Sequence, residues 1–274
     1  MKNAVPILFA VVLISGFSSC NDTTVISGSG QPFLFDQHFY PTEIGTFWNY
    51  RVDTTGQSGP TVRDVSRITA RIRGSIVLDS LQYTVQENET ISGANTTFDT
   101  LYIRKDGEGI HLSSPSLRQG FGGPLSGFIG SFPKEFLILP ANLESTSSWN
   151  IINFEFNQIP IFPIYFRVNA SYLGKETVQT DFKTYKECAR IRIDIDARFP
   201  NPQNPTDFLN PLIIKENASF WLARPLGLVV GDGSSLVFTL LSGQIPLSLT
   251  KRRVHQEVMG LEIVQPHDPC NGRM

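Results

Sequence analysis

Three cysteines and four histidines are the residues of this 274-residue chain best suited to covalent or metal chemistry. A thiol can be acylated, can pair in a disulfide or can bind a metal ion, and an imidazole can act as a base or a ligand. Cys20, Cys188 and Cys270 have no second cysteine at ligand spacing, and no two histidines lie within four residues of each other. We therefore expect neither a metal site nor a cofactor.

The sequence contains no motif of a common enzyme class. It has no Gly-x-Ser-x-Gly elbow of a hydrolase and no phosphate-binding loop. Asp194 and Asp196 could form a carboxylate pair or a calcium site, but they alternate with arginines, which favours cross-strand ion pairs on a solvated face. We therefore expect that the protein is not an enzyme. A hydrolase is the least favoured alternative, and it would need His111 or His255 beside a carboxylate or hydroxyl group.

The charge of the chain is nearly balanced. Its formal net charge is −2, and only Lys251-Arg252-Arg253 brings three positive side chains together. A solvated strand end explains so short a cluster. The composition therefore predicts no nucleic-acid partner and no polybasic contact with anionic lipid.

The first twenty residues have the layout of an export signal. Lys2 is positively charged, residues 4–17 form an uncharged and mostly apolar run, and two serines precede Cys20. The apolar run is too short for an ordinary membrane-spanning helix. Its end, Phe17-Ser18-Ser19-Cys20, resembles the lipobox of bacterial lipoproteins. The alternative is an ordinary cleaved signal beside an unrelated cysteine.

The lipobox resemblance implies a modification and a location. It implies that residues 1–20 are a lipoprotein signal, that Cys20 receives a diacylglycerol, and that Cys20 becomes the first residue after cleavage. The membrane would then be a partner through this anchor. The resemblance implies residence in the cell envelope, and Asn21 gives no inner-membrane retention signal, which favours the outer membrane, on its periplasmic or surface face.

With Cys20 assigned to lipid, two cysteines remain. Cys188 and Cys270 would lie in an oxidising compartment, where a disulfide can persist and contribute ~2–4 kcal/mol. Two unpaired thiols are the alternative, with Cys188 buried as a small apolar side chain and Cys270 in the tail. The sequence leaves both possibilities open.

Beyond the signal, composition separates three segments. Residues 21–38 are mostly polar and Gly/Ser-rich at first, and they lack periodicity, which predicts a flexible tether. Residues 39–264 carry the strand patterns and predict a single β domain. Residues 265–274 are expected to be a C-terminal tail.

Strand signals dominate the predicted domain. The clearest segment is 190–199, in which isoleucine, alanine and phenylalanine alternate strictly with arginine and aspartate. This pattern is typical of an antiparallel strand with one buried and one solvated face. Residues 134–143 give the one hint of a short helix, interrupted by Pro140. The predicted fold is therefore all-β, with an antiparallel sheet or sheets that form an open half-barrel or a sandwich.

Three stretches of the domain carry a further resemblance. The first, residues 40–50, has the pattern Tyr-Pro-x-x-x-Gly-x-x-Trp-x-Tyr. With residues 174–188 and 220–229 it resembles secreted bacterial β-domain proteins, largely of unassigned function. The resemblance spans residues 39–232 and implies architecture rather than chemistry. The open half-barrel of lipoprotein-carrier proteins is a further comparison, by architecture alone.

The chain also shows signs of an internal repeat. Trp48-Asn49 recurs as Trp149-Asn150, and Tyr83 recurs as Tyr185, each about a hundred residues later. This spacing predicts two similar meanders over residues 45–112 and 146–230. Chance recurrence of aromatic strands is the alternative.

One glycine-rich loop, residues 120–132, combines backbone freedom with large apolar side chains. These side chains either pack on the core or border a site for a hydrophobic ligand. We expect a membrane-anchored envelope lipoprotein whose β domain binds a lipid or another hydrophobic ligand, and the alternative is a structural or adhesion module that engages another envelope protein. The candidate ligand-loop residues are Phe121, Leu125, Phe128, Ile129 and Phe132.

Overall fold

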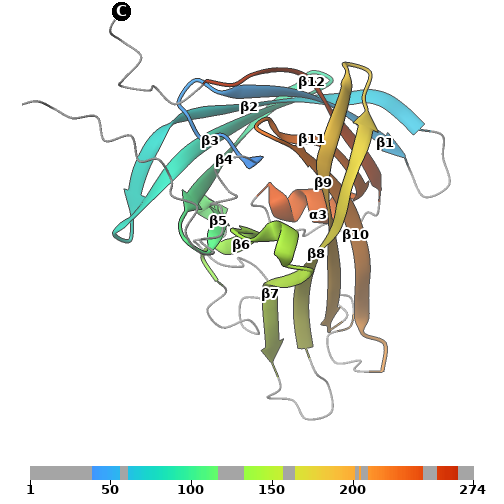
Figure 1. The fold of residues 1–274 in the computed structure, drawn as a ribbon. Helices are drawn as coiled ribbons and strands as arrows, with labels where there is room; N and C mark the ends of the chain where they lie inside the picture. The colour runs from blue at the N-terminus through green and yellow to red at the C-terminus, as the bar shows by residue number, and fades with distance from the viewer. Residues whose placement is uncertain are drawn as a thin grey trace, which may run out of the picture. The chain divides into compact units, whose positions relative to one another are not determined.

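The computed structural model describes residues 39–55, 61–116, 133–156, 164–200, 204, 209–242 and 252–264. Twelve strands of these ranges form one antiparallel sheet, in the order β6-β5-β4-β3-β2-β1-β12-β11-β10-β9-β8-β7. Figure 1 shows this sheet curving around the short helix α3. The strands are β1 (Phe47–Thr55), β2 (Thr61–Leu78), β3 (Leu81–Ser92), β4 (Asn95–Lys105), β5 (Gly109–Ser113), β6 (Phe136–Pro140), β7 (Ser148–Phe156), β8 (Ile164–Gln179), β9 (Thr184–Phe199), β10 (Leu212–Ala223), β11 (Gly227–Ser234) and β12 (Arg253–Glu262).

The all-β, antiparallel prediction is confirmed. The described strands form one curved sheet rather than the two sheets of a sandwich, so the half-barrel alternative is correct and the sandwich alternative is wrong. Strand β9 shows why. Its apolar side chains at 191, 193, 195, 197 and 199 are all buried on the concave face, while the charged residues between them face outward. A sheet with one apolar face lowers its free energy by curling that face inward.

Consecutive strands pair with each other except β6 and β7, and β12 also pairs with β1, which joins the two halves of the order. The edge strands are β6 and β7, which the 3₁₀ turn η1 (Leu143–Ser145) connects. The chain thus forms two consecutive six-stranded meanders, with Trp48 in β1 and Trp149 in β7. The predicted repeat of residues 45–112 and 146–230 stays a prediction, to be tested by superposing the two segments.

The three stretches singled out in the sequence meet in one cluster of the core. This cluster combines Trp48 and Tyr50 of β1 with Tyr185 and Cys188 of β9 and with Val229 of β11. The Trp48 indole Nε1 donates a hydrogen bond to the carbonyl oxygen of residue 226 at 2.6 Å, and the Tyr50 hydroxyl donates one to that of residue 228 at 3.1 Å. The opening motif therefore ties the first strand to the turn and strand near the end of the domain.

Helix α3 (Ser235–Leu241) lies on the concave side of the sheet (Figure 1). Ser234 caps its N-terminus by accepting a hydrogen bond from the backbone N–H of Leu236. Leu236, Val237 and Leu240 are buried, and the helix packs against β9, β10, β11 and β12. The sequence analysis did not predict this helix.

The prediction of a short helix at residues 134–143 is wrong. Residues 136–140 form the edge strand β6, paired with β5, and only the 3₁₀ turn η1 follows. An edge strand tolerates a proline at its end, because Pro140 loses no ladder hydrogen bond that the sheet requires there. No helix in the described ranges is long and apolar enough to cross a membrane.

The chain divides into two compact units, and the larger, Pro32–Pro266, contains all the described residues. The predicted signal at residues 1–20, the tether at 21–38 and the tail at 265–274 lie outside the described residues. These three assignments stay predictions.

Candidate functional site

A cavity of about 470 Å³ lies between the concave face of the sheet and helix α3. Its volume is within the range of small-molecule binding sites. Strands from both meanders line it. The described lining residues are Tyr40, Tyr50, Val52, Ile68, Ala70, Gln86, Asn88, Thr90, Thr97, Asp99, Leu101, Leu112, Ile138, Leu139, Ile191, Ile193, Phe220, Leu222, Leu228, Ser235, Phe238, Thr239, Leu241, Ser242, Val254 and Gln256.

One wall of the cavity is apolar. Ile191 and Ile193 come from β9 and Phe220 comes from β10, where strict alternation places them on the concave face. Phe238 of α3 completes this wall, with its ring centroid 5.1 Å from that of Phe220. Such a wall favours aliphatic or aromatic parts of a ligand, since their transfer from water is favourable.

Another part of the wall is polar. Gln86, Asn88 and Thr90 occupy successive inward positions of β3. The Tyr40 hydroxyl donates a hydrogen bond to Gln86 Oε1 at 2.5 Å, and Gln86 Nε2 donates one to Asn88 Oδ1 at 2.8 Å. Burial raises the pKa of Tyr40 far above its usual value, against a smaller lowering by Gln86, so its hydroxyl remains a donor. The cavity therefore offers both an apolar wall and a chain of oriented hydrogen bonds.

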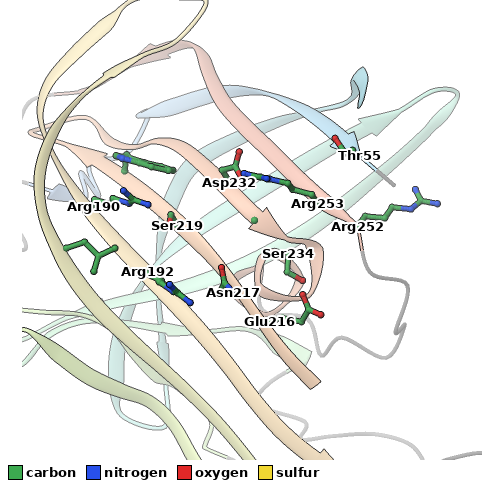
Figure 2. A pocket seen from close by; sticks show the side chains of 13 residues that line it. Thr55, Arg190, Arg192, Glu216, Asn217, Ser219, Asp232, Ser234, Arg252 and Arg253 are labelled. Carbon is green, nitrogen blue, oxygen red and sulfur yellow. Dashed lines mark hydrogen bonds and ion pairs between the residues drawn. The ribbon is translucent and has the colours of Figure 1, made fainter. Parts of the chain in front are cut away.

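A second hollow, of about 760 Å³, lies on the outer face of the same sheet (Figure 2). Arg190, Arg192 and Arg253 line it, and each is within ion-pair distance of a carboxylate. The Arg192–Asp194, Arg253–Asp232 and Arg190–Glu176 ion pairs have N–O distances of 2.8, 2.7 and 3.7 Å. Although this hollow is larger, three of the four arginines that line it already form ion pairs, so the apolar cavity is the better candidate site.

A polar cluster at the β4–β5–β6 edge surrounds His111. His111 Nε2 lies 3.1 Å from Asp106 Oδ1, and Arg104 forms ion pairs with both Asp106 and Glu135. Burial acts to raise the pKa of Asp106, but the hydrogen bonds from Arg104 and from a backbone N–H outweigh it and lower the pKa to about 2. Burial also acts to raise the pKa of Glu135, but the hydrogen bonds from Arg104 and Tyr83 outweigh this effect, and the pKa of Glu135 is lowered. Both carboxylates therefore stay ionised at neutral pH.

Replacing Arg104 with methionine is expected to lower the free energy of unfolding at pH 7 by about 2–3 kcal/mol, because two partly buried carboxylates lose their cation. Both carboxylates have lowered pKa values in the folded state, so the contribution is present above their unfolded pKa and is lost as pH falls toward about 2. The difference between the two proteins should therefore shrink in acid. Urea unfolding at pH 7 and pH 3 measures it.

Arg73→Met is the matched control, since Arg73 pairs with Glu87 at 2.6 Å while both side chains are about half exposed. This variant should lose less than about 1 kcal/mol. Equal losses from the two substitutions, or a loss independent of pH, would contradict the role assigned to Arg104.

His255 lies in another charged cluster, on β12. Its Nδ1 is 3.2 Å from Asp232 Oδ2, and this hydrogen bond raises the pKa of His255 against the effect of its partial burial. Arg51 joins this cluster through Glu257 at 2.5 Å and Asp181 at 2.7 Å. Both imidazoles that the hydrolase alternative named thus lie beside carboxylates, and these carboxylates are themselves held by arginines.

The sequence matches no family model and no curated protein. Three solved structures are similar over most of their length. A candidate lipoprotein from Parabacteroides distasonis is 12% identical, with a TM-score of 0.41, and 82% of this chain and 99% of that chain are covered. A candidate exported protein with a YmcC-like fold from Bacteroides fragilis is 10% identical, with a TM-score of 0.37 and the same coverage. A LolA superfamily protein from Nitrosomonas europaea is 9% identical, with a TM-score of 0.28, and 90% and 99% of the two chains are covered.

The residues predicted for lipidation and for the ligand loop lie outside the described residues. This applies to Cys20 and to the loop side chains Phe121, Leu125, Phe128, Ile129 and Phe132. Lipidation of Cys20 and the role of this loop therefore stay predictions.

Of the two cysteines proposed for a disulfide, Cys188 is described and Cys270 is not. Cys188 is fully buried, and its thiol lies 3.6 Å from the carbonyl oxygen of Tyr185. Burial raises the pKa of the Cys188 thiol to about 11. The disulfide between them stays a prediction.

Asp194 and Asp196 lie on the outer face of β9. The ion pair of Asp194 is with Arg192 of its own strand, at 2.8 Å, whereas Asp196 accepts a hydrogen bond from the Tyr165 hydroxyl of β8 at 3.3 Å. These aspartates lie on the outer face, as predicted, but Asp194 pairs with an arginine of its own strand and not with one across the sheet. Among the described residues no group of three histidine, cysteine, aspartate or glutamate side chains could hold a metal ion.

The sequence analysis missed the polar wall of the cavity. The sequence does contain a signal on β3. Its alternate positions Gln86, Asn88 and Thr90 are polar, whereas the corresponding inward positions of β9 are apolar. The neighbouring strand β2 presents Ile72, Ala70 and Ile68 opposite them. Amides at inward positions of an otherwise apolar face are costly to bury without hydrogen bonds, so such positions are candidates for a ligand contact.

Proposed function

We propose that this protein is an envelope lipoprotein that binds a hydrophobic, lipid-like molecule in the cavity between its curved sheet and α3. The observation that carries the proposal is this cavity of about 470 Å³, to whose lining both meanders and the helix contribute apolar side chains. A packed core fills such a space with its own side chains. A space of this size lined by aliphatic and aromatic groups suits an acyl chain or a comparable apolar group.

The anchor is a separate part of the proposal. The signal-like residues 1–20 and the resemblance of residues 17–20 to a lipobox support a lipid on Cys20. The Gly/Ser-containing residues that follow would let the β domain reach away from the membrane surface. Mass spectrometry of the intact protein tests this part, because an unmodified Cys20 or a retained leader would remove the argument for a membrane anchor.

Ala70→Trp tests the cavity. Ala70 is buried on β2, lines the cavity, and presents only a methyl group to it. An indole at this position would occupy part of the space, so we expect binding of the neutral fluorescent probe N-phenyl-1-naphthylamine to weaken at least about tenfold. The binding constant is obtained from the rise in probe fluorescence on titration with purified protein.

Arg71→Trp is the matched control. Arg71 is the next residue of β2, is exposed, and faces away from the cavity. It should bind the probe as the unchanged protein does. Saturable binding that Ala70→Trp leaves unaltered would place the probe elsewhere, and the absence of binding by the unchanged protein would count against the proposal.

A further inference from the structure

The described lining of the cavity has an unusual distribution of charge. It contains no lysine, arginine or histidine, and its one ionisable carboxylate is Asp99 of β4. Asp99 lies directly opposite Asn88 in the β3–β4 ladder, and Thr97 lies opposite Thr90. The polar part of the wall is therefore built from amides, hydroxyls and one acid.

The amides on this wall have capacity for further hydrogen bonds. Asn88 is 92% buried (8% exposed), and its Oδ1 accepts from Gln86 Nε2 at 2.8 Å. This bond uses the amide oxygen of Asn88 and neither of its NH₂ hydrogens. Gln256 of β12 is also 8% exposed, and its side-chain amide lines the same cavity. Each amide has two donor hydrogens and an acceptor oxygen.

The chain of hydrogen bonds fixes which atoms are presented. The Tyr40 hydroxyl donates to Gln86 Oε1, and Gln86 then donates to Asn88 Oδ1. This direction fixes the Asn88 amide with its oxygen toward Gln86, so that its NH₂ group is the part left to donate. A ligand group beside Asn88 must therefore accept a hydrogen bond.

The same wall disfavours an anion. A carboxylate or phosphate brought into the cavity loses its water, gains no lysine or arginine among the described lining residues, and meets the carboxyl group of Asp99. A carbonyl, amide or hydroxyl group has a much smaller desolvation cost, and it can accept from Asn88.

We infer that the ligand is an amphiphile with an uncharged hydrogen-bonding end group, such as an ester, amide or glycerol hydroxyl, held by the Gln86–Asn88 amides. This inference rests on the proposed function, because it assigns the polar end of a molecule whose apolar part fills the same cavity. The free fatty acid of the same chain length is the ligand that the wall rejects.

Competition between two amphiphiles of equal length tests the inference. Decanamide and decanoate are titrated at pH 8 into purified protein that holds N-phenyl-1-naphthylamine, and the loss of probe fluorescence is followed. Decanamide should displace the probe at a concentration at least about tenfold lower than decanoate, because only decanoate must bring a charge into a cavity whose described lining residues include no cation.

Two variants assign the preference to the polar wall. Gln86→Leu and Asn88→Leu remove the amides separately, and either should reduce the ratio of the two displacing concentrations severalfold, mainly by weakening decanamide. Gln82→Leu is the matched control on the same strand, where the glutamine is exposed and lies outside the cavity lining. It should keep the full ratio.

The outcomes separate the two proposals. Decanoate that displaces the probe as well as decanamide does, or better, overturns the inference and leaves the cavity as a binding site. The inference also falls if the ratio is the same in Gln86→Leu, Asn88→Leu and Gln82→Leu. Failure of the unchanged protein to bind the probe or either amphiphile overturns the proposed function itself.

Discussion

Replacing Trp48 with alanine is expected to lower the free energy of unfolding by about 3–5 kcal/mol, the usual cost of removing a buried tryptophan side chain. Trp48 is only 2% exposed, and its ring packs in the cluster that joins the three sequence stretches of the domain. Its ring centroid lies 5.7 Å from that of Tyr40, so the substitution also removes a neighbour of the residue that begins the hydrogen-bond chain of the cavity. The carbonyl oxygen of residue 226 loses its donor as well.

Trp149 provides the comparison for Trp48. It occupies the corresponding place in the predicted repeat, on β7, but it is only half-buried and packs at the margin of the other core cluster. Trp149→Ala should therefore cost less, about 1–2 kcal/mol. Urea unfolding followed by far-ultraviolet circular dichroism measures both. Equal losses of unfolding free energy would contradict the greater contribution to stability assigned to Trp48.

Gly233→Ala is expected to cost at least about 3 kcal/mol, because the new methyl group has no room and the backbone conformation is unfavourable. Gly233 has φ of +148° in β11, directly opposite Ala218 of β10. A Cβ atom there would lie 2.3 Å from the Cα of Ala218 and 2.5 Å from the carbonyl oxygen of Asn217. Both are backbone atoms of a central strand, so relief requires the two strands to separate.

Gly74→Ala is the control for Gly233→Ala. Gly74 lies in β2 without a positive φ, and a Cβ atom there would meet nothing within 4 Å. Since alanine also has less conformational entropy to lose on folding, this variant should be as stable as the unchanged protein or slightly more stable. A Gly233→Ala protein that unfolds at the same urea concentration as Gly74→Ala would contradict the predicted collision.

The sequence allowed the strands to be predicted where one face is uniform. In β9 every inward residue is apolar and every outward residue from 190 to 198 is charged, so burial alone decides its orientation. The β6 segment misled for a physical reason: its short apolar run, Phe136–Pro140, fits a helix or a strand equally well, and pairing with β5 decides between them. Helix α3 was missed because it has only seven residues and owes its place to packing on four strands.

The sequence indicated apolar strand faces but not the residues that line the cavity, and its loop prediction stays a prediction. Apolar strand faces indicated a hydrophobic ligand, yet the residues chosen came from a glycine-rich loop that lies outside the described residues. The described residues that line the cavity lie on eleven separate elements between β1 and β12, apart from Tyr40 and Ser242. Only the curvature of the sheet brings Gln86 of β3 and Phe220 of β10 to one space, and curvature leaves no local mark on the sequence.

The pairing of β1 with β12 also constrains the order in which the domain can be completed. Strand β1 is made first, but the backbone groups on one of its edges find hydrogen-bond partners only when β12, the last strand, has been made. The other pairs in the sheet join strands that are consecutive in the sequence. A nascent chain that has not yet released residues 253–262 therefore keeps two open edges, on β1 and on β11, in the middle of the future wall. These open edges make a truncated product prone to aggregate.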